Sequence, residues 1–132
     1  MRNVSQQNVA VARRWVELFN ARDDVDAFLS LHDPEVVLQT PGVPRLRGRD
    51  QVRDWFEARY ESVRPRILPE RFVAEGDTVV RLGRTEVRWI ESGEIAHEGE
   101  SAGAFRFRDG KIITWQPFGT YGAALTETGL RE

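Results

Sequence analysis

Three short glycine-containing turns divide the second half of the chain into segments in which apolar and polar residues alternate. The turns are Gly76-Asp77, Glu91–Glu94 and Asp109-Gly110. Tight turns between segments of period two are typical of β-hairpins. The sequence therefore predicts four consecutive antiparallel strands, over residues 66–75, 78–90, 95–108 and 111–118.

The first half of the chain has the spacing of helices instead. Val9, Ala12, Trp15, Val16 and Phe19 recur at the 3.6-residue interval of one helix face. Later segments with helical spacing begin at capping aspartates and end at or near prolines, which cannot continue the helical hydrogen bonds. The predicted elements are helices over residues 5–21, 25–31 and 50–64, a strand over residues 35–40, and a weakly helical segment over residues 120–130.

This order of elements predicts the fold class. Helices gathered first and hairpin-connected strands afterwards are typical of an α+β fold, with the helices packed on one face of a curved, mostly antiparallel sheet. The chain has 132 residues, contains no internal repeat and no linker, and is expected to form a single domain over residues 1–132.

Composition and charge exclude several function classes. The chain has no cysteine and two histidines, which excludes disulfides and leaves too few ligands for a structural zinc site. A formal net charge of −2 argues against nucleic-acid binding, although 18 of the basic residues are arginine and only Lys111 is lysine. No apolar run is long enough to span a membrane and no signal peptide is visible, so a cytoplasmic location is expected.

Four stretches carry a resemblance to a known family. They are residues 12–21, residues 32–38 with 47–52, residues 104–115, and residues 124–130. In this order and spacing the chain resembles the nuclear transport factor 2-like superfamily, and within it the SnoaL-like, polyketide cyclase-like branch. The resemblance implies a cone-shaped domain with an apolar cavity for a small apolar or oxygenated organic ligand. It also implies no cofactor or metal, and a homodimer formed through the outer face of the sheet.

Catalytic members of this superfamily use carboxylates in a dry pocket, where burial raises their pKa. The steroid-isomerase pattern aligns with Trp15, Thr40 and Gly103 and finds none of its tyrosine and acidic groups there. Steroid-isomerase activity is therefore not expected.

The epoxide-hydrolase pattern is matched in part. Its Arg-x-Asp element resembles Arg84-Thr85-Glu86, while its second aspartate falls at Pro117. Residues two apart in a strand share a face, so Glu86 could act as a base with Arg84 orienting it or a substrate oxygen. The alternative is an ion pair on the surface of a charged strand.

His97 is the third candidate catalytic group. Counting in steps of two places it on one strand face with Gly99, Ser101, Gly103 and Phe105, where small residues leave room for a ligand. His97 would then lie near the cavity mouth as an acid or base. The alternative, which the neighbouring glutamates favour, is a solvated histidine at the end of a hairpin.

Two functions follow as hypotheses. One is a cofactor-independent isomerase, cyclase or hydrolase that uses carboxylate acid–base chemistry on an apolar oxygenated substrate. The other is a non-catalytic ligand-binding or protein-interaction module of the same fold. In either case the residues expected to contact the ligand are Trp15, Leu38, Thr40, Phe56, Tyr60, Gly103, Phe105, Trp115 and Tyr121.

Overall fold

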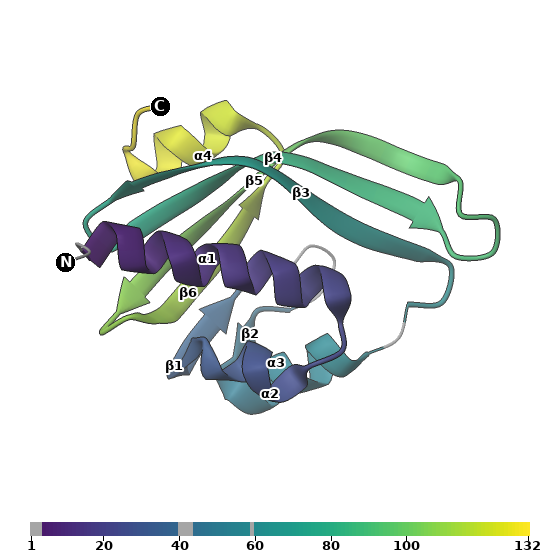
Figure 1. Cartoon of the computed structure of the whole chain (residues 1–132), viewed down its shortest axis with the longest axis horizontal. Helices are drawn as coiled ribbons and strands as arrows, with labels where there is room; N and C mark the ends of the chain where they lie inside the picture. The colour runs from purple at the N-terminus through teal and green to yellow at the C-terminus, as the bar shows by residue number, and fades with distance from the viewer. Residues whose placement is uncertain (1–3, 40–43, 59) are drawn as a thin grey trace.

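A six-stranded sheet curves around three helices, and a fourth helix covers part of its other face (Figure 1). The computed structural model describes residues 4–39, 44–58 and 60–132. The elements are α1 (Val4–Ala21), α2 (Val25–Ser30), β1 (His32–Leu38), β2 (Leu46–Arg47), α3 (Gly48–Glu57), β3 (Val63–Glu75), β4 (Thr78–Trp89), β5 (Ile95–Arg108), β6 (Lys111–Phe118) and α4 (Tyr121–Thr128).

The strand order is β2-β1-β6-β5-β4-β3, so the last four strands form the hairpin meander that the three turns predict. Every neighbouring pair is antiparallel except β1 and β6, which run parallel. The predicted α+β class, with helices packed on a mostly antiparallel curved sheet, is confirmed. In the described part of the chain, no helix has the length and apolarity required to cross a membrane.

The third helix is shorter than predicted. α3 ends at Glu57, whereas the prediction extended it almost to Pro65. The backbone from Val63 instead joins β3 and pairs with Trp89 at the far end of β4. Because β3 is the edge strand of the sheet, Pro65 is tolerated there without loss of a ladder hydrogen bond.

β1 also begins earlier than predicted, at His32 rather than at residue 35. His32 already pairs with Ile112 of β6, and the backbone N–H of Ile112 donates to the carbonyl of Leu31. The strand therefore starts directly after α2, and Pro34 lies within it.

The hydrophobic core has two parts, one on each side of the sheet. The larger part lies between the helices and the concave face and is centred on Trp15, whose ring is fully buried. The rings of Phe19, Phe28, Phe105 and Trp115 have centroids 4.8–5.5 Å from that of Trp15. The smaller part lies under α4 on the outer face and is formed by Val80, Leu82, Ala102, Ala104, Ala124 and Leu130.

His32 is fully buried beside Trp15 and has a partner for each ring nitrogen. The indole Nε1–H of Trp15 donates to its Nε2 at 2.9 Å, and its Nδ1 lies 2.8 Å from the carbonyl oxygen of Phe28. A neutral ring protonated on Nδ1 satisfies both contacts. Burial lowers the pKa of His32 from 6.5 to about 4, so the ring is neutral near pH 7.

His32 therefore makes stability depend on pH. The unfolded chain takes up a proton on this ring below about pH 6.5, whereas the folded chain resists protonation until about pH 4. The folded state loses stability as the pH falls through this window, by up to about 3 kcal/mol. Urea unfolding of the wild type and of His32→Gln at pH 7 and at pH 4.5 measures this loss of unfolding free energy. The wild type should lose more stability than the variant, and equal losses would contradict this assignment.

Candidate functional site

An inner cavity of about 310 Å³ lies between the concave face of the sheet and the ends of α1 and α3. Most of its walls are aromatic or aliphatic. The lining residues are Phe19, Trp55, Tyr60, Pro65, Ile67, Arg81, Thr85, Ser101, Ala102, Trp115, Pro117 and Phe118.

The register of β4 against β5 decides which side chains reach this cavity. Arg81 lies opposite Gly103, and Thr85 lies opposite Gly99. Directly opposed residues of an antiparallel pair point to the same face of the sheet. The face that holds Arg81 and Thr85 is therefore the concave one, because Val79 and Phe105, a further opposed pair, belong to the inner core.

Three polar side chains of the cavity, Arg81, Ser101 and Thr85, form one short chain of hydrogen bonds. Arg81 donates from Nη1 to the hydroxyl of Ser101 at 3.0 Å and to its carbonyl at 3.2 Å. The hydroxyls of Ser101 and Thr85 are 2.7 Å apart. Arg81 is only 2% exposed. Burial lowers its pKa to about 10, which still leaves the guanidinium charged at neutral pH.

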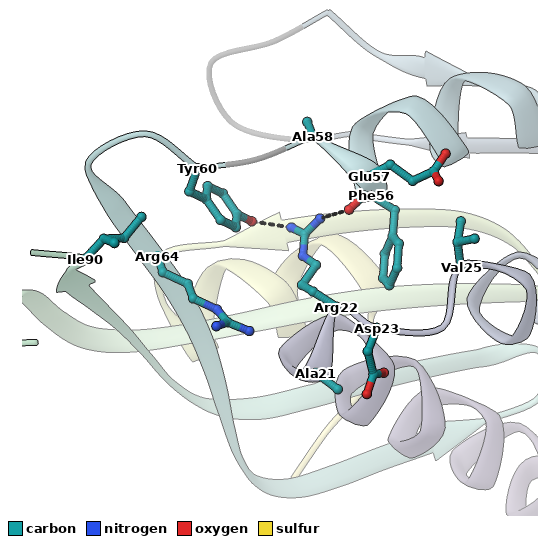
Figure 2. A pocket seen from close by; sticks show the side chains of 10 residues that line it. All are labelled: Ala21, Arg22, Asp23, Val25, Phe56, Glu57, Ala58, Tyr60, Arg64 and Ile90. Atoms are coloured by element: carbon teal, nitrogen blue, oxygen red, sulfur yellow. Dashed lines mark hydrogen bonds between the residues drawn. The ribbon is translucent and has the colours of Figure 1, made fainter.

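A second, more open hollow of about 570 Å³ lies beside the inner cavity (Figure 2). Tyr60 lines both spaces, whereas Arg22 lines the open hollow. The guanidinium of Arg22 lies 4.6–5.2 Å from the ring centroids of Phe19, Trp55, Phe56 and Tyr60.

Arg22 connects the end of α1 to the end of α3 through side-chain hydrogen bonds. Its Nη1 donates to the carbonyl of Phe56 at 2.8 Å and to that of Trp55 at 3.3 Å, and its Nη2 donates to the Tyr60 hydroxyl. These carbonyls belong to the last turn of α3, where no helical partner remains for them. The backbone of Arg22 is left-handed, with φ of 54°, as suits a residue just past a helix end. Arg22 is therefore a structural residue that lines the open hollow and contacts three residues of the inner cavity's wall, Phe19, Trp55 and Tyr60.

The hypothesis that Glu86 acts as a base in the cavity is wrong. Strand alternation places Arg84 and Glu86 on the outer face with Leu82, which packs under α4. Glu86 pairs with Arg88 at 2.5 Å, and that hydrogen bond lowers the pKa of the carboxyl, the reverse of what a base near neutral pH needs. Arg84 pairs with Glu98 at 2.9 Å instead of with Glu86.

His97 is exposed at the hairpin end of β5 and is not part of the cavity wall. It lies opposite Val87, two positions beyond the Thr85–Gly99 pair. The structure thus favours the solvated histidine over the acid or base at the cavity mouth. In the described part of the chain, no group of three or more histidine and acidic side chains is arranged to hold a metal ion.

The structure brings together only some of the predicted contact residues. Tyr60 and Trp115 line the inner cavity, and Gly103 lies between Trp115 and Arg81. Phe56 lines the open hollow. Three others are fully buried in the inner core and line neither space: Trp15, Leu38 and Phe105.

The outcomes for the last two predicted contacts, Tyr121 and Thr40, differ. The prediction for Tyr121 is wrong, because this residue packs with the outer cluster and its hydroxyl donates to Glu70. Thr40 lies outside the described residues.

Sequence reasoning missed Arg81, Thr85 and Ser101, the polar groups of the cavity. A signal existed, because Ser101 shares the strand face with Gly99 and Gly103, which was predicted to line the cavity. Pairing that face with β4 by register would have assigned Arg81 and Thr85 to it as well.

A curved sheet that packs against helices and leaves an apolar cavity is the architecture of a class of folds that have small-molecule pockets. The SnoaL-like domain model matches residues 12–115, and the chain belongs to this family within the nuclear transport factor 2-like superfamily. No curated protein matches the sequence.

Solved structures share the fold at low sequence identity. An NTF2-like protein of unknown function from Burkholderia pseudomallei is 21% identical over 91% of this chain and 95% of its own, with a TM-score of 0.74. A proposed polyketide cyclase from Xanthomonas campestris is 19% identical over 94% and 98%, with a TM-score of 0.75. An epoxide hydrolase from Mycobacterium tuberculosis is 15% identical over 95% and 94%, with a TM-score of 0.70. At these identities the likeness establishes the fold alone.

Arg22→Leu should destabilise the protein by about 2–3 kcal/mol, because it removes the hydrogen bonds to the end of α3 and the stacked cation. Urea unfolding measures the loss. The matched control is Arg14→Leu in α1, the helix that precedes Arg22, which removes only an exposed pair with Glu17 and should cost less than about 1 kcal/mol. Equal effects of the two substitutions would contradict the role of Arg22.

Proposed function

We propose that this protein binds an apolar small molecule in the inner cavity and that binding, rather than carboxylate catalysis, is its function. The observation that carries the proposal is a cavity of about 310 Å³ with mainly apolar walls and a few convergent polar groups. Cavities of about 300–1,000 Å³ with this character are typical of small-molecule sites.

The hypotheses of carboxylate catalysis and of ligand binding differ in whether the inner cavity must be lined by a carboxyl group. An isomerase, cyclase or hydrolase that works by carboxylate chemistry needs a carboxyl group within hydrogen-bond reach of its substrate. None of the cavity's lining residues, all within the described part of the chain, is aspartate or glutamate. This supports the non-catalytic ligand-binding alternative.

A neutral fluorescent probe tests the proposal. N-Phenyl-1-naphthylamine brightens when it enters an apolar site, and we expect saturable binding with a stoichiometry of one. Thr85→Phe places a ring in the cavity and should weaken probe binding at least about tenfold, because space and apolar area are lost together.

Glu86→Gln is the matched control, since it changes a side chain on the same strand but on the outer face. It should leave probe affinity unchanged. Absence of saturable binding in the wild type, or equal binding in Thr85→Phe, would overturn the proposal.

The homodimer through the outer face stays a prediction. Beyond α4 this face carries the ion pairs Arg84–Glu98 and Arg88–Glu86, so a two-fold contact there would be polar. Such a contact weakens as salt screens its charges. Sedimentation at 50 mM and 1 M NaCl should show a dimer that dissociates at high salt; a monomer at both concentrations would rule it out.

A further inference from the structure

Arg81 is a buried cation that has no counter-charge among the residues that the structure describes. Its side chain lies in the wall of an apolar cavity, and the residue is only 2% exposed. An unpaired charge in such surroundings costs several kcal/mol, so buried arginines are normally paired with carboxylates. Among the described residues no carboxylate lies within ion-pair distance of Arg81.

Only one of the three nitrogen atoms of this guanidinium, Nη1, has a hydrogen-bond acceptor among the described residues. Nη1 donates to Ser101, through its hydroxyl and its carbonyl, and both acceptors are neutral. Nε and Nη2 have no acceptor among the described residues, and each retains a little accessible surface. Two donor groups of a charged side chain are therefore left for a bound molecule.

A second unused donor lies close by, on the other side of Gly103. A Cβ at position 103 would lie 3.6 Å from Nη2 of Arg81 and only 2.8 Å from Nε1 of Trp115. The indole N–H of Trp115 has no acceptor in the described part of the chain. Glycine at this position leaves the two donors uncovered, whereas any side chain would displace the indole.

The unused hydrogen-bond donors of Arg81 and Trp115 indicate which chemical class of ligand the cavity would bind. A guanidinium and an indole N–H offer donors only, and the remaining walls are mainly apolar. A carboxylate accepts hydrogen bonds from a guanidinium in a charge-assisted geometry, and it supplies the missing negative charge. An amide or alcohol of the same shape could accept hydrogen bonds but would leave the cation unneutralised.

We propose that the inner cavity binds an apolar carboxylate, whose carboxylate group accepts hydrogen bonds from the guanidinium of Arg81 and the indole N–H of Trp115. This inference rests on the proposed function, and it adds the charge and class of the ligand. The Ser101 hydroxyl is a positioning group, because it accepts from Nη1 and so orients the free edge of the guanidinium, and the Thr85 hydroxyl acts through its hydrogen bond to Ser101.

Two probes of nearly equal shape test the inference: 2-naphthylacetate and its neutral primary amide, 2-naphthylacetamide. Calorimetric titration at pH 7.5 should show that the wild type binds the carboxylate at least about tenfold more tightly than the amide, as a desolvated charge-assisted contact predicts. In Arg81→Met this preference should disappear or reverse. A wild type without a preference for the carboxylate, or Arg81→Met with the preference intact, would overturn the inference.

Arg84→Met is the matched control, because Arg84 lies three residues along the same strand on the outer face and pairs with Glu98. It removes the same charge from the protein and should leave the carboxylate preference unchanged. If Arg84→Met abolishes the preference as fully as Arg81→Met does, the attraction comes from overall charge and the site assignment is wrong.

The two proposals fail in different ways. N-Phenyl-1-naphthylamine should still bind Arg81→Met, because the cavity remains apolar; binding of this neutral probe without any carboxylate preference would leave the proposed function standing and refute the ligand class.

Thermal unfolding gives a further readout. Arg81→Met should melt about 4 °C or more above the ligand-free wild type, since it removes an unpaired buried charge. A lower melting temperature would show that Arg81 stabilises the empty protein and would contradict its role as a ligand anchor.

Discussion

The packing of aromatic rings around Trp15 is the contact on which the rest of the structure depends. The Trp15 side chain packs α1 against aromatic rings of α2, β5 and β6. Its indole N–H donates a hydrogen bond to His32 at the start of β1. Trp115, whose ring centroid is 4.8 Å from that of Trp15, also lines the inner cavity. The core and the cavity wall are thus continuous through Trp115.

The electrostatics of the cavity differ from those of a carboxylate enzyme. In such enzymes burial destabilises an anion and raises its pKa into the range of a useful base. Here burial acts on a cation, Arg81, and lowers its pKa without neutralising it. The site therefore attracts negative charge and offers donors, which suits holding an acid more than removing a proton from a substrate.

Much of the fold could be predicted from the sequence because it depends on local signals. The turns at Gly76, Gly93 and Gly110 all have positive φ and close the hairpins where the alternating pattern stops. The long third helix was predicted wrongly because helical spacing continued past Glu57, while pairing of Val63 with β4 decided the conformation. That pairing is a tertiary effect that no local pattern contains.

The candidate site was harder to predict, and β4 shows why. Each face of this strand carries an arginine directly after an apolar residue, Arg81 after Val79 on one face and Arg84 after Leu82 on the other. Alternation alone cannot say which of the two arginines turns inward. The register with β5 decides it, because Arg81 lies opposite Gly103 and Arg84 lies opposite Glu100. For the same reason, sequence reasoning proposed Arg84 and Glu86 for the cavity and assigned no role to Arg81.

The four indole N–H groups offer the most direct test of the account. Their resonances in a proton–nitrogen correlation spectrum report separately on Trp15, Trp55, Trp89 and Trp115 during titration with 2-naphthylacetate. The signal of Trp115 should move furthest, that of Trp55 less, and those of Trp15, bonded to His32, and exposed Trp89 should barely move. A titration in which Trp115 stays still while Trp89 moves would place the ligand outside the cavity and contradict the account.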